Sequence, residues 1–492
     1  AQMSNELILA IDQGTTNTKA LAFDAEGRVV ASASSPMAVS YPQPGWAEQS
    51  ATDIWHSVLS VIAEVVAKVG PDMDALAISN QRETIVVWDS RTGQPIAPAI
   101  LWQCRRSAPA CAAIRAAGHG TLIEARTGLG VDPLFPAAKL AWILDHVPGA
   151  REAAASGHLR AGTIDAWLLW NFTGGEHATD HSNASRTQLF NTEALGWDEE
   201  LGRIFNVPLS LLPRVRASDS AFGTVIYGVS ALASGVPIHA MIGDSHAALF
   251  GHGVREPGTV KATYGTGTSL MTLTSGRIMS RSGLSSTIAW STSAGVAYAL
   301  EGNISVSGQA VAFMGSLLGL SDPAAVAALA LTVPDSNGVT FVPALVGLGA
   351  PYWDPDARGS VSGLSLGTTP AHLARAAVEA IAFQVTDVFT AMETDLGQPL
   401  ARLSADGGAA RNDMLMQFQA DLIDRPVLRG ELPEVSAAGA ALLAATGLGR
   451  NTTRADKAQR QFAPQMSEAQ RQAALSGWLS GVGRVLQRDA IT

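Results

Sequence analysis

The sequence predicts an α/β protein built from two similar domains. Its 492 residues are enough for two to four domains of ordinary size. A strand, a glycine-containing polar turn and a returning strand occur at residues 7–23 and again at residues 260–273. Helical and strand patterns also follow one another along the chain, as in helices packed on sheets.

The first of these hairpins begins with an apolar strand at residues 7–11 that ends on Asp12. Gly14 allows a tight turn, and the hydroxyl, amide and N–H groups that follow it can converge on an anion; they belong to Thr15, Thr16 and Asn17. The chain then returns as a strand at residues 19–23 instead of entering a helix, which excludes a P-loop and a Rossmann fingerprint.

This pattern suggests a hairpin that holds a phosphate in its turn. Asp12 would face a metal ion and Lys19 a phosphoryl group. An ordinary structural hairpin is the alternative, and the first hairpin alone does not decide between the two.

Composition limits the classes of partner. The net charge is −10, which argues against nucleic acid or an anionic membrane surface as a main partner. The two cysteines, Cys104 and Cys111, lack the spacing of metal ligands, so we expect reduced thiols in a cytoplasmic protein. No apolar run has the length of a membrane span, and the start of the sequence lacks a signal-peptide pattern.

Charged and aromatic residues follow several predicted strands. A helix is predicted at residues 51–69 with Thr52 as its N-cap, followed by strands at residues 75–78 and 85–88. Arg82 and Glu83 lie between these strands, at the sheet edge where open α/β folds bind ligands. Trp102 ends a further apolar strand, residues 100–101. A surface ion pair and a half-buried tryptophan are the alternatives for these two clusters.

Asp244 occupies a junction between a strand and a helix. Residues 136–143 and 161–170 have helical apolar patterns, residues 237–242 predict a strand, and residues 245–250 predict a helix. The positive end of the helix dipole favours an ionised carboxylate at Asp244, which suits a general base. A plain N-cap is the alternative.

The second hairpin repeats the first. Strands at residues 260–263 and 270–273 enclose a glycine–hydroxyl turn, in which Thr266 corresponds to Thr15. Two such hairpins imply two similar domains with the phosphates of a nucleotide between them. Further on, a strand at residues 403–406 leads to Gly408, and a helix is predicted to begin near Asn412.

The tail from residue 451 is polar and then helical, with Ser467 as its cap. We expect its apolar stripe to pack against the second domain; the stripe comprises Leu475, Trp478, Leu479, Val482, Val485 and Leu486.

Together these motifs resemble the FGGY carbohydrate kinases, and the glycerol kinase subfamily most closely. The similar stretches are residues 80–84, 102–106, 162–165, 179–187, 347–355 and 406–412. The resemblance implies two actin-like, ribonuclease H-like α/β domains with a deep interdomain cleft. We place the acceptor site and first phosphate hairpin in residues 1–252, and the nucleotide site, second hairpin and C-terminal helix in residues 253–492.

The resemblance also implies an activity, the ATP-dependent phosphorylation of a primary hydroxyl of a small polyol or ketose. Asp12 would hold Mg²⁺ through water, and Asp244 would take the proton of the acceptor hydroxyl. The residues expected around the phosphates and nucleotide are Thr15, Thr16, Asn17, Lys19, Thr266, Gly308, Gly408 and Asn412. Those expected around the acceptor are Arg82, Glu83, Trp102, Leu134, Asp244 and Ser245. A homodimer or higher homo-oligomer is also expected.

Departures from the subfamily bear on the acceptor. Leu134 stands where glycerol kinases carry a tyrosine, and Ser245 and His246 stand where they carry two glutamines. These changes suggest a pocket that suits a longer polyol or ketose and uses glycerol poorly. Glycerol kinase itself is the alternative; a non-catalytic actin-superfamily ATPase or a sugar sensor is a more distant one. The basic loop through which some bacterial relatives bind a sugar-bisphosphate inhibitor is replaced by the uncharged residues 230–235.

Overall fold

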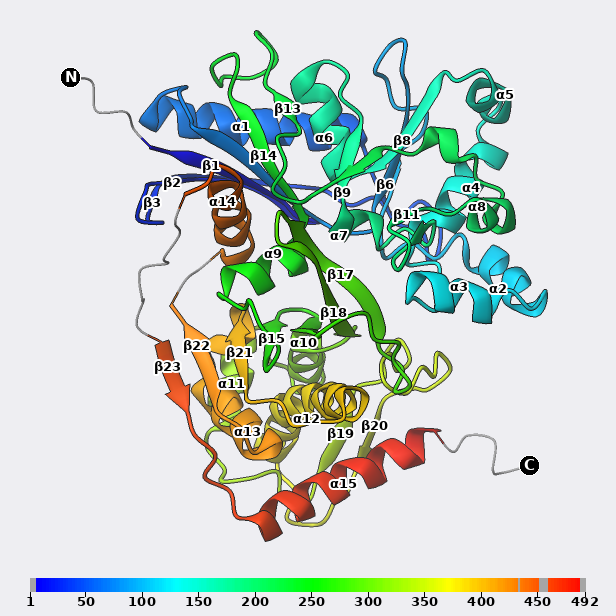
Figure 1. Cartoon of the computed structure of the whole chain (residues 1–492). Coiled ribbons are helices and arrows are strands. Elements are labelled where there is room, and N and C mark those ends of the chain that lie inside the picture. The colour runs from blue at the N-terminus through cyan, green and yellow to red at the C-terminus, as the bar shows by residue number, and fades with distance from the viewer. Residues whose placement is uncertain (1–5, 432–433, 451–458, 487–492) are drawn as a thin grey trace. The chain divides into compact units, whose positions relative to one another are not determined.

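The computed structural model describes residues 6–431, 434–450 and 459–486, which form two compact units (Figure 1). Of the described residues, the first unit takes in 6–255, 286–299 and 434–450, and the second takes in 256–285, 300–431 and 459–486. No helix within the described ranges is long and apolar enough to cross a membrane.

The main sheet of the first unit has the strand order β13-β14-β5-β1-β2-β3. β1 (Ile8–Gln13) runs antiparallel to β2 (Asn17–Phe23) and parallel to β5 (Ala75–Asn80). The other strands are β3 (Val29–Pro36), β13 (Gly223–Thr224) and β14 (Pro237–Gly243). β14 is parallel to β5, so the carboxyl ends of β1, β5 and β14 meet at one edge of the sheet.

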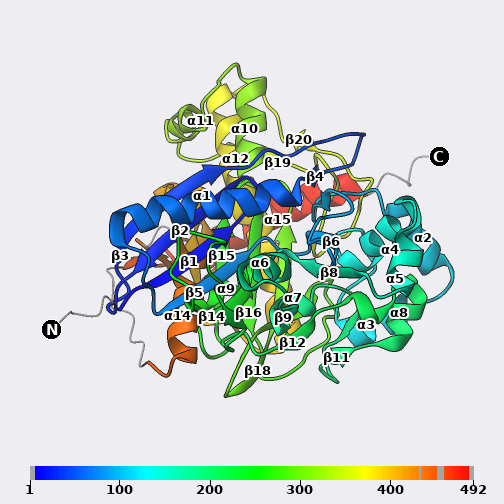
Figure 2. The same ribbon diagram turned by 90° about the horizontal axis from the view of Figure 1, so that it is seen from above.

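Helices cover both faces of this sheet. Alternate strand residues such as Leu9, Ile11 and Ile78 join one core with α1 (Ala51–Val69) and α6 (Ile164–Thr173). The alanine-rich α14 (Val435–Gly447) contacts β1, β5 and β14, and Figure 1 shows it across the sheet from α1. Figure 2 shows α1 lying along the strands.

A smaller sheet of the first unit has the order β4-β7-β6-β8. Its strands are β4 (Glu48–Gln49), β6 (Ile85–Asp89), β7 (Ala99–Ile100) and β8 (Leu159–Thr163). A second core lies under it, contributed by α2 (Ala108–Ala116), α3 (Gly120–Thr127), α4 (Pro136–His146), α5 (Ala150–Ala155) and α8 (Glu199–Phe205).

Short elements complete the first unit. β9 (Ala178–Asp180) pairs with β12 (Arg214–Arg216), and β10 (Phe190–Asn191) pairs with β11 (Gly196–Trp197). α7 (His181–Ala184) follows β9, and α9 (Asp244–Gly251) follows β14 without an intervening loop.

The second unit repeats the topology of the first sheet. Its strands lie in a seven-stranded sheet of order β17-β18-β16-β15-β21-β22-β23, in which β17 spans Ser285–Thr292. β15 (Thr259–Tyr264) is antiparallel to β16 (Thr268–Leu273) but parallel to β21 (Arg402–Asp406). β22 (Val427–Gly430) is parallel to β21 and antiparallel to β23 (Gln459–Phe462), as β14 is to β5 and β13. The prediction of two similar α/β domains is confirmed.

Helices pack around this second core. They are α10 (Gly308–Leu317), α11 (Pro323–Ala330), α12 (Pro370–Leu396), α13 (Asp413–Ile423) and α15 (Glu468–Leu486). β18 spans Gly295–Ile304, and the small pair β19 (Thr340–Val342) and β20 (Ser360–Ser362) lies beside α15.

Some local predictions were wrong. α1 is capped by Ser50, whose hydroxyl accepts the Asp53 N–H at 3.1 Å, and not by Thr52. Residues 161–163 belong to β8 because pairing with β6 outweighs their helical pattern. The strand before Trp102 is only Ala99–Ile100.

The tail prediction holds in part. Trp478, Val482 and Val485 are buried in the core of the second unit, but Leu479 is 55% exposed. The apolar stripe is therefore narrower than the sequence pattern suggested. The first residues of the tail, 451–458, lie outside the described residues.

Candidate functional site

Asp12 lies at the carboxyl end of β1, opposite Lys19 on β2 and Ser79 on β5. The Ser79 hydroxyl donates a hydrogen bond to the Asp12 carboxylate at 3.1 Å. Burial, the Asp244 carboxylate and the Glu434 carboxylate raise the pKa of Asp12 to about 7. The carboxylates of Asp244 and Glu434 therefore both repel that of Asp12, an arrangement that a bound cation would relieve.

The turn after β1 is closed by a hydrogen bond from the Gly14 N–H to the Asn17 carbonyl at 2.9 Å. The Thr15 hydroxyl accepts the indole N–H of Trp102 at 2.9 Å. Thr16 and Asn17 are exposed. The structure thus brings Thr15 of the predicted phosphate turn together with Trp102 of the predicted acceptor wall.

Lys19 has a partner that sequence reasoning missed. Its ammonium lies 2.8 and 3.0 Å from the two carboxylate oxygens of Glu434. Glu434 is the N-cap of α14 and has a positive φ of 64°, a conformation that a non-glycine residue adopts only when its surroundings impose it. Because 415 positions separate the two residues, no local sequence signal links them.

Arg82 and Asp244 meet at the carboxyl edge of the sheet. Arg82 Nε lies 3.4 Å from Asp244 Oδ1; the arginine side chain is 9% exposed and the aspartate 36%. The Ser245 N–H donates to Asp244 Oδ1 at 2.7 Å, and the Ser436 hydroxyl on α14 donates to the Asp244 carbonyl at 2.9 Å. These contacts hold Asp244 in place as the first residue of α9.

His246 is fully buried behind Arg82, which settles an orientation that the sequence could not give. Its Nε2 lies 3.3 Å from Arg82 Nη1, and its Nδ1 lies 3.2 Å from the Ala289 carbonyl. Because arginine can only donate, Nε2 accepts and Nδ1 carries the proton. His246 therefore supports the guanidinium of Arg82 instead of presenting a free ring to an acceptor.

Glu83 is buried and pairs with Arg186, which sequence reasoning did not single out. Arg186 Nε donates to Glu83 Oε1 at 2.9 Å, and both side chains are at most 5% exposed. Glu83 also has a positive φ of 65°. The pair fixes the Glu83 carboxylate against the segment that follows α7.

A buried lysine joins two predicted acceptor residues. Lys139 Nζ donates to the Leu134 carbonyl at 2.7 Å and to the Trp102 carbonyl at 3.3 Å. Burial lowers the pKa of Lys139 to about 7. A lysine within the apolar pattern of residues 136–143 was the signal that could have found it.

In the second unit, Thr263 and Asp406 occupy the register positions that Asp12 and Ser79 hold in the first. The Thr263 hydroxyl donates to Asp406 Oδ2 at 3.1 Å, so the carboxylate and the hydroxyl have exchanged strands. Thr266 is exposed at the tip of the second turn, and its carbonyl accepts the N–H of Ser307 at 2.9 Å.

The predicted glycines gather around the end of β15. The Gly308 N–H donates to the Gly265 carbonyl at 2.9 Å, and a Cβ on Gly308 would lie 2.6 Å from that oxygen. Gly407 has a φ of 96° and lies against Tyr264, and Gly408 starts the 3₁₀ turn Gly408–Arg411. Asn412 caps α13 by accepting the Leu415 N–H at 3.2 Å.

The predicted site residues thus fall into two sets. Those expected at the acceptor and the first phosphate turn lie in the first unit, and Thr266, Gly308, Gly408 and Asn412 lie in the second. Within the described part of the chain, no group of three or more His, Cys, Asp or Glu side chains is placed to hold a metal ion. Mg²⁺ needs no such group, since it is commonly bound by one or two carboxylates, water and substrate phosphates.

Comparisons with known proteins cover both units. The FGGY family of carbohydrate kinases matches with its N-terminal domain at residues 7–251 and its C-terminal domain at residues 260–448. A glycerol kinase of Symbiobacterium thermophilum is 48% identical, covering 98% of this chain and 99% of the relative. An apulose kinase of Pectobacterium atrosepticum is 49% identical, covering 91% of this chain and 90% of the relative.

A solved structure agrees with the fold. The crystal structure of Plasmodium falciparum glycerol kinase with ADP has a TM-score of 0.93 and 31% sequence identity, covering 98% of this chain and 99% of that chain. The actin-like two-domain fold expected from the sequence is confirmed.

Proposed function

Since the chain belongs to the FGGY family of carbohydrate kinases, we propose that it transfers the γ-phosphoryl group of ATP to a primary hydroxyl of a small polyol or ketose. The observation that supports this most is the pairing of Asp244 with Arg82 at the β14–α9 junction, in the same electrostatic cluster as Asp12.

Asp244 is suited to accept the proton of the attacking hydroxyl. Its carboxylate is partly exposed, so an acceptor can reach it, while Arg82 and the Ser245 N–H fix its direction. A positioned carboxylate orients the hydroxyl and takes its proton as the phosphoryl group is transferred. Lys19 is the cation placed nearest to Asp12 on the hairpin and would spread the charge of the phosphoryl oxygens.

Mg²⁺ fits the chemistry of these residues. The carboxylates of Asp244 and Glu434 both repel that of Asp12, and Asp12 would hold the ion through water. When bound, Mg²⁺ neutralises charge on the phosphate oxygens of ATP.

Glycerol is the acceptor that the relatives favour. A glycerol kinase aligns over almost the whole chain at 48% identity. The comparisons support this alternative better than our expectation that glycerol is a poor substrate.

A longer polyol or ketose is the second candidate, favoured by Leu134 and Ser245. Leu134 cannot donate a hydrogen bond where glycerol kinases carry a tyrosine, and Ser245 is shorter than glutamine. A glycerol hydroxyl buried beside Leu134 without a partner would lose about 1–3 kcal/mol. The similarity to an apulose kinase is consistent with this candidate.

An ADP-release assay over three- to six-carbon polyols and ketoses tests both candidates. It should compare the wild type with the double variant Leu134→Tyr/Ser245→Gln. If glycerol is the best wild-type substrate, it is the acceptor and the two positions do not set specificity. If a four- or five-carbon acceptor exceeds glycerol at least tenfold in kcat/KM, and the double variant shifts preference back toward glycerol, the second candidate replaces the first.

A further inference from the structure

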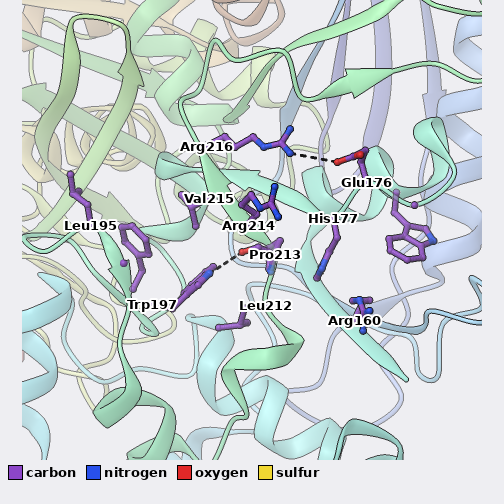
Figure 3. A pocket seen from close by; sticks show the side chains of 14 residues that line it. Arg160, Glu176, His177, Leu195, Trp197, Leu212, Pro213, Arg214, Val215 and Arg216 are labelled. Carbon is purple, nitrogen blue, oxygen red and sulfur yellow. Dashed lines mark hydrogen bonds and ion pairs between the residues drawn. The ribbon is translucent and has the colours of Figure 1, made fainter. Parts of the chain in front are cut away.

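A cavity of about 850 Å³ opens in the first unit, outside the residues assigned to acceptor, phosphate or nucleotide (Figure 3). It is lined by residues just before β9, by β12 and by the β10–β11 pair, together with Arg160 of β8 and Trp170 of α6. Its volume is within the range of pockets that hold small molecules.

The charge of this cavity is opposite to that of the whole protein. Arg160, Arg214 and Arg216 line it, against the single carboxylate of Glu176. Arg216 Nη2 lies 3.5 Å from Glu176, which leaves two arginines in excess. In a chain of net charge −10, such a cluster of guanidinium groups marks a place where an anion is favoured.

Arg160 and Arg214 have guanidinium N–H groups that can donate hydrogen bonds to a ligand. Arg160 Nη1 donates to the carbonyls of Gly157 at 3.0 Å and Leu159 at 2.9 Å, which fixes the guanidinium. Its Nε and Nη2 make no hydrogen bond within the described ranges, and neither does the exposed side chain of Arg214. A guanidinium fork held in this way matches two oxygens of a phosphate or carboxylate.

The histidine of the cavity adds no charge. His177 Nε2 donates to the Ala161 carbonyl at 2.8 Å, and burial lowers the pKa of this ring to about 4. The positive charge therefore comes from arginine alone and persists throughout the neutral pH range.

Aromatic surface lies beside the arginines. Trp197 is held by a hydrogen bond from its indole N–H to the Pro213 carbonyl at 2.8 Å and by edge contact with Phe190, the ring centroids being 5.4 Å apart. Trp170 and Leu212 also line the cavity. Fixed aromatic faces next to cations suit a ligand that has an apolar ring face and an anionic group.

We propose that this cavity binds a small sugar phosphate, with the phosphate on Arg160 and Arg214 and the sugar ring against Trp197. The proposal goes beyond the kinase reaction, because the cavity shares no residue with the expected acceptor or nucleotide sets.

Isothermal titration of the full chain with glucose 6-phosphate, in excess Mg–ADP to fill the nucleotide site, tests the proposal. We expect a Kd of about 1 mM or tighter, since a ligand of this size can reach that affinity. The variant Arg160→Ala/Arg214→Ala should weaken binding at least tenfold, because it removes charge-assisted hydrogen bonds. Arg203→Ala, at an exposed arginine of α8, is the matched control and should change the Kd less than twofold.

Further titrations distinguish binding in this cavity from binding in the acceptor site, and binding of a sugar phosphate from binding of other ligands. Trp102→Ala, at the expected acceptor wall, should bind glucose 6-phosphate as the wild type does; loss of binding would place the probe in the acceptor site and overturn the proposal. Glucose or citrate binding as tightly as glucose 6-phosphate would overturn the assigned ligand class. Equal binding by the wild type and the double variant, or none by either, would also overturn it. If the double variant does not fold, Arg214→Ala alone, at an exposed side chain, serves with the same expectation.

Discussion

The carboxylate of Asp244, at the first residue of α9, is our candidate for the general base. Asp244→Asn keeps the shape of the side chain and its place at the helix start but removes the basic group. We expect kcat to fall by about 10² or more, while the melting temperature and the affinity for the acceptor change little. Steady-state kinetics with thermal melting would check this. A variant that keeps most of the wild-type kcat would reject the assignment.

Single residues were predictable where their signal is local. Asp12 lies near the end of β1, and Arg82 and Asp244 lie just beyond the ends of β5 and β14, so the structure places all three at one sheet edge. Glu434 and Arg186 were missed because their partners lie 415 and 103 positions away. Such pairs are set by tertiary packing, which a strand or helix pattern does not encode.

The contact between α12 and α15 contains a buried carboxylate that makes stability depend on pH. Asp387 Oδ2 on α12 accepts the Trp478 indole N–H of α15 and the Tyr352 hydroxyl, both at 2.8 Å. Burial raises the Asp387 pKa from 3.8 to about 6. Since the folded state binds this proton more tightly than the unfolded chain, the associated stability is present below pH 4 and is lost as the pH rises through 6.

Asp387→Asn tests this linkage, because the amide oxygen can still accept both hydrogen bonds. Relative to the wild type, the variant should be more stable at pH 8 than at pH 5 by about 1.4 kcal/mol, since pH 5 lies one unit below the folded-state pKa. Urea unfolding at the two pH values would measure the difference. The exposed replacement Asp72→Asn is the control and should behave like the wild type at both. An equal effect of Asp387→Asn at pH 5 and pH 8 would contradict the linkage.

α9 and α14, which begin at Asp244 and directly after Glu434, cross at small residues. A Cβ on Gly439 would lie 1.8 Å from the Ala247 carbonyl, so Gly439→Ala must push the two helices apart. We expect a loss of about 2 kcal/mol or more in stability, together with reduced kcat. Gly477→Ala in α15 meets no atom within 4 Å and should be neutral or slightly stabilising. Similar melting temperatures for the two variants would show that the crossing tolerates a methyl group.

Helices and strands were predicted best where a periodic apolar pattern ran over many residues or where the turn between two strands had a characteristic sequence. The observed boundaries of both hairpins, of α13 and of the β14–α9 junction agree with the predicted ones to within about one helical turn, or roughly four residues. Residues 161–163 were misassigned because β8 is short, and only its pairing with β6 makes it a strand. Local pattern cannot supply that information.

At the scale of the whole molecule, the repeated strand order β3-β2-β1-β5-β14-β13 and β18-β16-β15-β21-β22-β23 is the main organising feature. The sequence predicted this repeat from the similar turns of the two hairpins, at residues 7–23 and 260–273. It did not predict that residues 286–299 and 434–450 belong with the first unit. The functional boundary between residues 252 and 253 stays a prediction, as does a homo-oligomeric state.

The repeat predicts that the first unit binds the acceptor and the second unit binds the nucleotide. A substitution at Gly408 tests this assignment. A Cβ on Gly408 would meet no atom within 4 Å, whereas one on Gly308 would lie 2.6 Å from the Gly265 carbonyl. The Cβ of a leucine at position 408 therefore meets no neighbour, and thermal melting checks that the whole side chain leaves the fold intact. A loss of activity in a folded variant would then indicate a ligand that approaches the backbone. We expect the KM for ATP to rise about tenfold or more, with the KM for the acceptor and the melting temperature unchanged. The double variant Leu134→Tyr/Ser245→Gln should instead change the KM for the acceptor and leave the KM for ATP unchanged. If Gly408→Leu raised the KM for the acceptor and not that for ATP, the assignment of the second unit to the nucleotide would be wrong.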